Sequence, residues 1–338
     1  MPHRVSIRDV AREAGVSVTT VSHALNGKGR LNTETRRRVL DVAERMGYRP
    51  NPAARSLVSG RTGLIAVMAS LPSEPRVEFS TFSYYSELIA AATAAAVDRD
   101  SALIVAPPSS RGWFVWDRVA LDGVIVIDPM VGDRALPVLR ERGIPFVTAG
   151  RDPNGHQQDA VVASDDRAST RDVLDHLVEA GADRVALVTI PPVISYITET
   201  VAAYEAWCAE RAQEPRVVTA EIPELVASPD ATFAAMVSAA LSGPDRPDAI
   251  FAPVELVGVA IHQALTSDGV SVPDDVMLVT THDAGAAAAA HITTLDWDYP
   301  GMGRMAADLL LDVIEGRRLP PCEELVTCTV VPRATTSR

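Results

Sequence analysis

Residues 6–15 alternate between polar and apolar positions with the period of an amphipathic helix. The apolar residues recur at spacings of three and four, at Ile7, Val10, Ala11 and Ala14. Ser6 and Asp9 have the spacing of a capping box, and Gly15 offers the left-handed backbone that commonly ends a helix. The pattern therefore predicts a short helix between Ser6 and Gly15.

Two more helices are predicted after this glycine. Ser17 is placed to cap the stretch VTTVSHALN, and Asn32 or Thr33 begins a third helix, ETRRRVLDVAERMG, which Gly47 ends. The inward positions of the second helix are Val21, Ala24 and Leu25. Its outward positions are Val18, Thr19, Ser22 and His23. The inner stripe of the third helix consists of Val39, Ala43 and Met46.

This arrangement is typical of a helix-turn-helix, in which the second helix enters the major groove of DNA with its N-terminal residues. Thr19 and His23 lie one turn apart on the outer face, so both side chains can reach base edges. The same pattern would also suit a small helical bundle with a solvated face. The segment that follows separates these two interpretations.

Residues 48–57, YRPNPAARSL, predict a short helix of unusual composition. Asn51 is a good N-cap and Pro52 occupies the first helical position. Ala54 permits the close approach of two such helices, and Arg55 can reach a phosphate or the minor groove. Leu57 has no core of its own to enter, whereas a leucine there can wedge between base pairs from the minor groove. The segment favours DNA binding over a solvated bundle.

Beyond Arg61 the pattern changes to strands that alternate with helices. The predicted strands are TGLIAVMAS, SALIVAP, DGVIVID, IPFVTAG, RVALVTI, AIFAPV and VMLVTTHD. The helical stretches include 87–99, 170–180 and 200–212. Apolar strands that alternate with helices predict parallel sheets covered on both faces, and the number of strands favours two α/β lobes.

One segment of the second part matches a dinucleotide-binding fingerprint. GMGRMA at Gly301–Ala306 has the glycine spacing, but Tyr299 and Pro300 precede it instead of a buried strand. The segment after the predicted helix lacks a second strand with an acidic residue. We interpret the glycines as the first turn of a closely packed helix and predict no cofactor.

The charge of the chain is distributed unevenly. Its formal net charge is −13, but residues 1–61 carry twelve Arg and Lys against five Asp and Glu, a balance of +7 that leaves −20 for the remainder. A basic head on an acidic body concentrates the attraction for phosphate in the head. Cys208, Cys322 and Cys328 are too scattered for a disulfide framework or a metal cluster. Without a signal peptide or membrane span in the sequence, we expect a soluble, cytoplasmic protein.

Residues 5–61 resemble the LacI family of bacterial transcription regulators. The motifs that carry the resemblance occur in order: VARxAGVSxxTVSxxLN, ETRxRVL, GYxPNPAARSL and RTGLIAV. The stretch VSVTTVSH is most similar to a member that responds to purines. The resemblance implies that the head contacts DNA through Ser17, Val18, Thr19, Thr20, Ser22, His23, Asn51, Ala54, Arg55 and Leu57. Leu57 would be the wedge in the minor groove.

The resemblance also implies the organisation of the whole chain. A small all-α head at 1–49 and a hinge at 50–61 would precede a two-lobed body similar to periplasmic sugar-binding proteins. The N-lobe would comprise 62–163 with 294–319, and the C-lobe 164–293 with 320–338. The chain would cross between the lobes near Ser164, Thr293 and Pro320.

An effector would bind in the cleft between the lobes, according to the same resemblance. The implied contacts are Tyr84, Tyr85, Thr200, Phe251, Asp283 and Trp297. Thr200 stands where many sugar-binding members have an arginine, and Val254 and Glu255 replace the usual Asn-Asp pair. Two polar anchors for a sugar are therefore missing, which favours a more apolar or aromatic effector.

The sequence thus predicts an effector-controlled, DNA-binding homodimer, most simply a repressor that reads a palindromic operator. A solute-binding protein for an importer is disfavoured by the basic head. An enzyme that uses His282 and Asp283, or His291, in the cleft lacks any nucleophile–base spacing, so no catalytic residue is assigned. The alanine-rich stretch 90–96 could pair two N-lobes or pack within its own lobe. Trp113 and Trp116 have no role that the sequence predicts.

Overall fold

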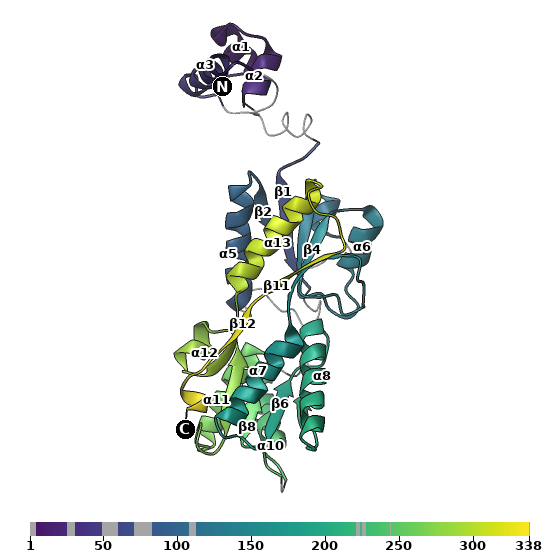
Figure 1. The fold of residues 1–338 in the computed structure, drawn as a ribbon, viewed down its shortest axis with the longest axis vertical. Helices are drawn as coiled ribbons and strands as arrows, with labels where there is room; N and C mark the ends of the chain where they lie inside the picture. The colour runs from purple at the N-terminus through teal and green to yellow at the C-terminus, as the bar shows by residue number, and fades with distance from the viewer. Residues whose placement is uncertain are drawn as a thin grey trace. The chain divides into compact units, whose positions relative to one another are not determined.

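The computed structural model describes residues 5–25, 31–48, 60–70, 83–107, 113–220, 224, 228–243 and 245–337. The chain divides into two compact units, Met1–Thr62 and Gly63–Arg338 (Figure 1). We call them the head and the body.

The described part of the head contains the three predicted helices: α1 (Ile7–Ala14), α2 (Val18–Leu25) and α3 (Thr33–Arg45). The capping box is present, since Asp9 N donates to Ser6 Oγ at 3.4 Å and Ser6 N donates to Asp9 Oδ2 at 3.0 Å. Gly15 ends α1 with φ 65°, and the side chain of Asn32 caps α3. Val10, Val21 and Val39, one from each helix, are fully buried in the common core.

The body contains two six-stranded sheets, which define an N-lobe and a C-lobe. All neighbouring strands of the first sheet are parallel, in the order β11 (Cys322–Val326), β5 (Ala160–Ser164), β4 (Phe146–Ala149), β3 (Gly123–Ile127), β1 (Leu64–Ala69) and β2 (Ala102–Val105). The order of the second sheet is β12 (Cys328–Val331), β10 (Thr293–Trp297), β9 (Met277–Thr281), β8 (Ala249–Phe251), β6 (Val185–Thr189) and β7 (Val217–Thr219). Only β12 in the second sheet is antiparallel to its neighbour.

Helices cover both faces of each sheet, as the strand–helix alternation predicts. The N-lobe carries α5 (Ser83–Asp98), α6 (Ala135–Arg142), α13 (Tyr299–Ile314) and the short helix η2 (Val115–Asp117). The C-lobe carries α7 (Asp166–Glu179), α8 (Ser195–Glu210), α10 (Pro229–Ala240), α11 (Glu255–Ser267), α12 (Gly285–Ala289) and η3 (Ala334–Thr336). Each sheet has a buried apolar cluster on either side, so the predicted fold class is confirmed.

The chain crosses between the lobes at positions that differ in part from the expected ones. The first crossing follows Ser164, the last residue of β5. The second follows Trp297, not Thr293, because all of β10 pairs within the second sheet. The third follows Val326, not Pro320, because Cys322 of β11 pairs with Ala160 in the first sheet. These pairings join segments far apart in the sequence, and periodicity carries no information about them.

Gly303 of GMGRMA lies where α13 packs closely on another helix, α5, whereas the sequence predicted close packing on a sheet, and Gly301 lies against the cap residue Asp298. Asp298 caps α13, and a Cβ at Gly303 would overlap the carbonyl group of Leu88 on α5, reaching within 2.9 Å of its carbon. The two helices lie side by side (Figure 1). Ala92 and Ala96 are fully buried against α13, so part of the alanine-rich stretch packs within its own lobe.

The two tryptophans without a predicted role have structural surroundings. The guanidinium of Arg118 lies 4.5 Å above the Trp113 ring. Trp116 stacks on Phe114 with ring centroids 4.4 Å apart, and both rings pack against the apolar cluster beneath α6. We assign these tryptophans to the packing of η2 on the N-lobe.

Candidate functional site

The outer face of α2 is the exposed surface that the sequence predicts. Val18 is 41% exposed, and Thr19 and His23 are also exposed, whereas Ser22 is half-buried. Ser17 Oγ accepts a hydrogen bond from Thr20 N at 3.1 Å and lies 2.8 Å from Thr20 Oγ1. The helix therefore begins with a side-chain cap, and its first two turns present Val18, Thr19 and His23 on the surface of the described part of the head.

The predicted hinge helix lies outside the described residues. Asn51, Ala54, Arg55 and Leu57 all fall in the range 49–59, so their predicted roles stay predictions.

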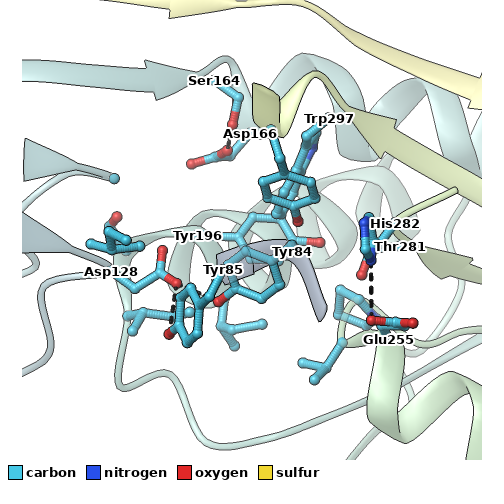
Figure 2. Close-up of a pocket in the computed structure, with 18 of the residues that line it drawn as sticks. Tyr84, Tyr85, Asp128, Ser164, Asp166, Tyr196, Glu255, Thr281, His282 and Trp297 are labelled. Atoms are coloured by element: carbon cyan, nitrogen blue, oxygen red, sulfur yellow. Dashed lines mark hydrogen bonds and ion pairs between the residues drawn. The ribbon is translucent and has the colours of Figure 1, made fainter. Parts of the chain in front are cut away.

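The body contains a cavity of about 170 Å³ that both lobes line (Figure 2). The N-lobe contributes residues that include Tyr84, Tyr85, Asp128, Arg151 and Tyr299. The C-lobe contributes residues that include Asp166, Tyr196, Glu255, His282 and Trp297. Most of these residues lie at strand ends or in the first turns of helices, where side chains from different elements converge.

Aromatic rings form a continuous wall of the cavity. Tyr84 stacks on Tyr299 with centroids 4.7 Å apart, and Tyr85 lies 4.3 Å from Tyr84. Trp297 meets Tyr196 edge to face at 4.2 Å and Tyr299 at 5.5 Å. The wall crosses from one lobe to the other and offers ring faces to a flat or apolar ligand.

Asp128 lies beside this wall, directly after β3. Its Oδ2 accepts hydrogen bonds from the hydroxyls of Tyr84 and, at 3.2 Å, Tyr85. Burial raises the pKa of Asp128 to about 6, although the two phenol hydrogen bonds act in the opposite direction. Burial and the neighbouring carboxylate hold the pKa of both tyrosines well above 10, so the phenols remain hydrogen-bond donors.

A second buried carboxylate, Asp166, lies at the first crossing between the lobes. Its Oδ1 accepts a hydrogen bond from Ser164 Oγ, and its Oδ2 lies 3.5 Å from Nη1 of Arg151. Burial raises the pKa of Asp166 to about 6 against the effects of Ser164 and Arg151. Arg151 also donates to the Ser164 carbonyl at 2.7 Å and pairs with Glu323 at 2.6 Å. Both terminal nitrogens of its guanidinium thus have partners in the protein.

A polar cluster joins the two lobes on the other side of the cavity. Ser83 of α5 donates to Glu255 of α11 at 2.7 Å, and its Oγ lies 2.9 Å from His282 Nδ1. His282 Nδ1 is 3.2 Å from Glu255, and its Nε2 is 3.5 Å from Glu87. Burial lowers the pKa of His282, but Glu255 and Glu87 raise it more, so the net change is upward. Figure 2 shows His282 and Glu255 of this cluster on one side and Asp128 on the other, with Tyr84, Tyr196 and Trp297 between them.

Comparison with known proteins agrees with both parts of the chain. The model of bacterial regulatory proteins of the lacI family matches residues 6–51, and that of a periplasmic binding protein-like domain matches residues 174–336. The chain is 29% identical over 333 residues, 94% of each protein, to the HTH-type transcriptional regulator CelR of Thermobifida fusca. It is 27% identical over 343 residues to the ribose operon repressor of Halalkalibacterium halodurans, covering 98% of this chain and 97% of that one.

A solved structure of similar fold is the complex of the transcriptional regulator CelR with cellobiose. It superposes with a TM-score of 0.71 at 25% identity and covers 98% of this chain and 100% of that one. The chain thus combines a head that matches the lacI family of bacterial regulatory proteins with a body that matches a periplasmic binding protein-like domain. The relatives named here are transcriptional regulators, and these similarities support DNA-binding, ligand-responsive regulation.

Within the body, the structure brings only part of the predicted effector site together. Tyr84, Tyr85 and Trp297 line the cavity. Thr200 does not, because it is fully buried in α8 with its hydroxyl 3.3 Å from that of Thr170. Phe251 does not either, because it is fully buried in the apolar cluster beneath α7 and α8.

Asp283 is the third predicted contact that the structure removes from the cavity. Its two carboxylate oxygens accept hydrogen bonds from the guanidinium of Arg333 at 2.9 and 2.8 Å, and Oδ1 also accepts one from Thr294 at 2.9 Å. The residue before it, His282, lines the cavity instead. His282 has φ 69°, and this turn of the backbone lets adjacent residues face different surroundings.

Several cavity residues were not predicted from the sequence, above all Asp128, Asp166, Tyr196 and Tyr299. One signal could have found Asp128 and His282, which lie in the last two positions of the predicted strands at 122–128 and 276–283 and directly follow β3 and β9. In open parallel sheets, ligands bind at the carboxyl ends of the strands. Tyr196 carries no comparable signal, because its place depends on how α8 packs across the lobe boundary.

Two other features of the described residues concern metal ligands and membrane-spanning helices. No group of three or more His, Cys, Asp or Glu side chains suited to a metal ion occurs within the described ranges. No helix in the described part of the chain is long and apolar enough to cross a membrane.

Proposed function

We propose that the chain is an effector-controlled transcriptional repressor that binds a palindromic operator as a homodimer. The observation that carries this proposal is the cavity whose wall comes from both lobes of a body attached to a helix-turn-helix head. A ligand there touches both lobes, so its binding free energy depends on their relative position. Similarity to the ribose operon repressor supports repression as the direction of control.

The exposed face of α2 is the proposed reading surface. Thr19 and His23 contact base edges in the major groove, and Val18 makes an apolar contact beside them. Ser17, Thr20 and Ser22 lie next to these residues and position the helix against the phosphates. A single small head makes a limited interface, and two-fold symmetric pairing doubles it on a palindromic site.

Residues 50–58 form the second DNA contact in this proposal. Asn51 begins a hinge helix, Ala54 lets the hinge helices of two protomers pack closely, and Arg55 reaches the minor groove. Leu57 is the wedge that enters between base pairs. A segment of this length is too short to be a stable helix alone in water, so it forms on DNA and can respond to the position of the body.

The proposed effector site is the cavity itself. Tyr84, Tyr85 and Trp297 supply ring faces, and the carboxylates and His282 supply polar contacts in both lobes. When the effector leaves, contacts within the protein replace those that it made. The lobes then change their relative position, and the two heads of the dimer move with them.

Selection of operator sequences from a random pool, followed by titration of His23→Ala, tests the proposal. The variant should lose about 1–3 kcal/mol of operator affinity and relax preference at one base position in each half-site. His156→Ala, at an exposed histidine of the body, is the matched control and should bind like the parent. Unchanged affinity and preference in His23→Ala would refute the assignment of α2. A light-scattering mass of one or four chains per operator would refute the dimer.

A further inference from the structure

The charges around the cavity are unbalanced. Asp128, Asp166 and Glu255 line it, whereas its basic residues are Arg151 and His282. Arg151 is held by Asp166, Glu323 and the Ser164 carbonyl. His282 lies between Glu255 and Glu87. Both positive groups are thus already matched by carboxylates of the protein.

Asp128 is the cavity carboxylate that neither Arg151 nor His282 pairs with. Its hydrogen-bond partners among the described residues are the phenols of Tyr84 and Tyr85, and no Lys, Arg or His of these residues forms an ion pair with it. A buried carboxylate is costly unless a cation or several strong donors neutralise it. Its raised pKa, about 6, expresses the same lack of compensation.

The surroundings of Asp128 suit a positive charge in a second way. The ring of Tyr84 packs between Tyr85 and Tyr299, and these faces continue to Trp297. The faces of aromatic rings carry negative electrostatic potential and attract ammonium groups within about 6 Å of the ring. A carboxylate beside such faces therefore binds a cation with both elements at once.

The cavity is also poor in groups that bind anions or pair with many hydroxyls. The described lining contains no Asn, Gln or Lys, and its one arginine is engaged. The hydroxyls of Tyr84 and Tyr85 point their hydrogens at Asp128. The lining also holds neutral donors without a hydrogen-bond partner, Tyr196 Oη and Trp297 Nε1, so the preference for a cation comes from the charge of Asp128 and not from a shortage of donors.

We propose that the effector is a cationic amine with a flat or apolar body, whose ammonium group pairs with Asp128 while the body stacks on the tyrosine and tryptophan faces. This assignment rests on the proposed function, since it takes the cavity to be the effector site. It disfavours phosphorylated or carboxylated effectors, because their charge would face the carboxylate of Asp128 and both basic residues of the lining are already paired.

The experiment compares benzylammonium with benzyl alcohol, two probes of nearly equal shape that differ in charge. Thermal unfolding and calorimetric titration are followed for the full chain, for Asp128→Asn and for Asp268→Asn. Asp268 lies exposed at the end of α11, so the last variant makes the same change away from the cavity. Cellobiose is included as a neutral saccharide.

Benzylammonium should stabilise the parent chain and Asp268→Asn against thermal unfolding, and it should bind both at least tenfold more tightly than benzyl alcohol does. Asp128→Asn should bind the two probes with similar affinity. The affinity of the parent chain for benzylammonium should fall as pH decreases through about 6, where Asp128 takes up a proton. Equal binding of both probes, an undiminished response in Asp128→Asn, binding of cellobiose alone, or no binding of benzylammonium would each overturn the cationic assignment. None of these outcomes affects the operator titration of His23→Ala, which tests the proposed function separately.

Discussion

Asp128→Asn changes the charge of the cavity without removing the contacts that hold the residue in place. The asparagine side chain keeps an oxygen that can accept the hydrogen bonds of Tyr84 and Tyr85. Asp128 has φ 47°, a left-handed conformation that asparagine also adopts at little cost. We therefore expect the variant to fold normally and to differ from the parent mainly in electrostatics.

The sign and size of the effect follow from the pKa of Asp128. Its folded value of about 6 lies above the ordinary 3.8, so the folded protein keeps this proton to higher pH than the unfolded chain does. Below about pH 4 both states are protonated, and the aspartate costs nothing. Between about pH 4 and pH 6 the unfolded chain has released this proton while the folded state still holds it, so the stability of the parent falls by up to about 3 kcal/mol and levels off above pH 6. Because the residue is only half-buried, we expect about 1–3 kcal/mol.

The assay is thermal unfolding of the body from about pH 4 to about pH 7.5, for the parent, Asp128→Asn and the exposed control Asp268→Asn. The parent and Asp128→Asn should have similar stability at the acid end of this range. At neutral pH the variant should be more stable than the parent. Asp166, whose pKa is also raised to about 6, remains in the variant and leaves some pH dependence. A variant that is less stable at neutral pH would show that Asp128 is paired with a cation in the folded protein. A difference independent of pH would refute the assigned pKa.

Two other substitutions test the packing of the body. Gly303→Ala places a Cβ against the Leu88 carbonyl group, where neither backbone can yield easily, and should lower the free energy of unfolding of the body by about 1–3 kcal/mol, measured by thermal unfolding. Asp283→Ala should cost about 1–3 kcal/mol because it frees the Arg333 guanidinium, while the calorimetric response to cavity ligands stays unchanged. A lost ligand response in that variant would return Asp283 to the effector site.

The described part of the head could be predicted from the sequence almost residue by residue, because local interactions decide its structure. The capping box of Ser6, the glycine at position 15 and the cap at Asn32 each act within one helical turn. The periods of three and four also separate buried Val21 from exposed Thr19 and His23. Each of these caps and buried positions depends on residues close by in the sequence, and contacts with distant residues do not change them.

The body was predictable in its class but not in its full topology. All seven predicted strands are present, and they are central or strongly apolar segments. The five strands that were missed include the sheet edges β7, β11 and β12, and β11, with the sequence CEELV, alternates between half-buried and exposed positions for most of its length. An edge strand needs fewer apolar residues, so its pattern is weak. The pairing of β10 and β11 with different sheets then moved two of the lobe crossings.

The cavity shows most clearly why a site between lobes resists prediction. Three aromatic residues were assigned correctly to its wall, but Phe251 and Asp283 lie on the same strands as true lining residues or next to them. Which side of a strand end faces the cavity depends on backbone turns such as that at His282. Such turns involve single residues, so they cannot be predicted from hydrophobic periodicity.

The geometry of the cavity also limits how an effector can act. Ser83 on α5 already bonds Glu255 and His282 across the lobe boundary, while Asp128, on the far side, lacks a comparable partner among the described residues. A ligand that pairs with Asp128 and packs against Trp297 of the other lobe therefore adds a bridge to those that the protein already makes between the lobes, such as Arg151 with Asp166 and the Val131–Val193 backbone hydrogen bond. A ligand can shift the equilibrium between the alternative lobe positions, and with it the heads, only by the difference in its binding free energy for those positions. Binding to one lobe alone, however tight, would leave the regulator insensitive.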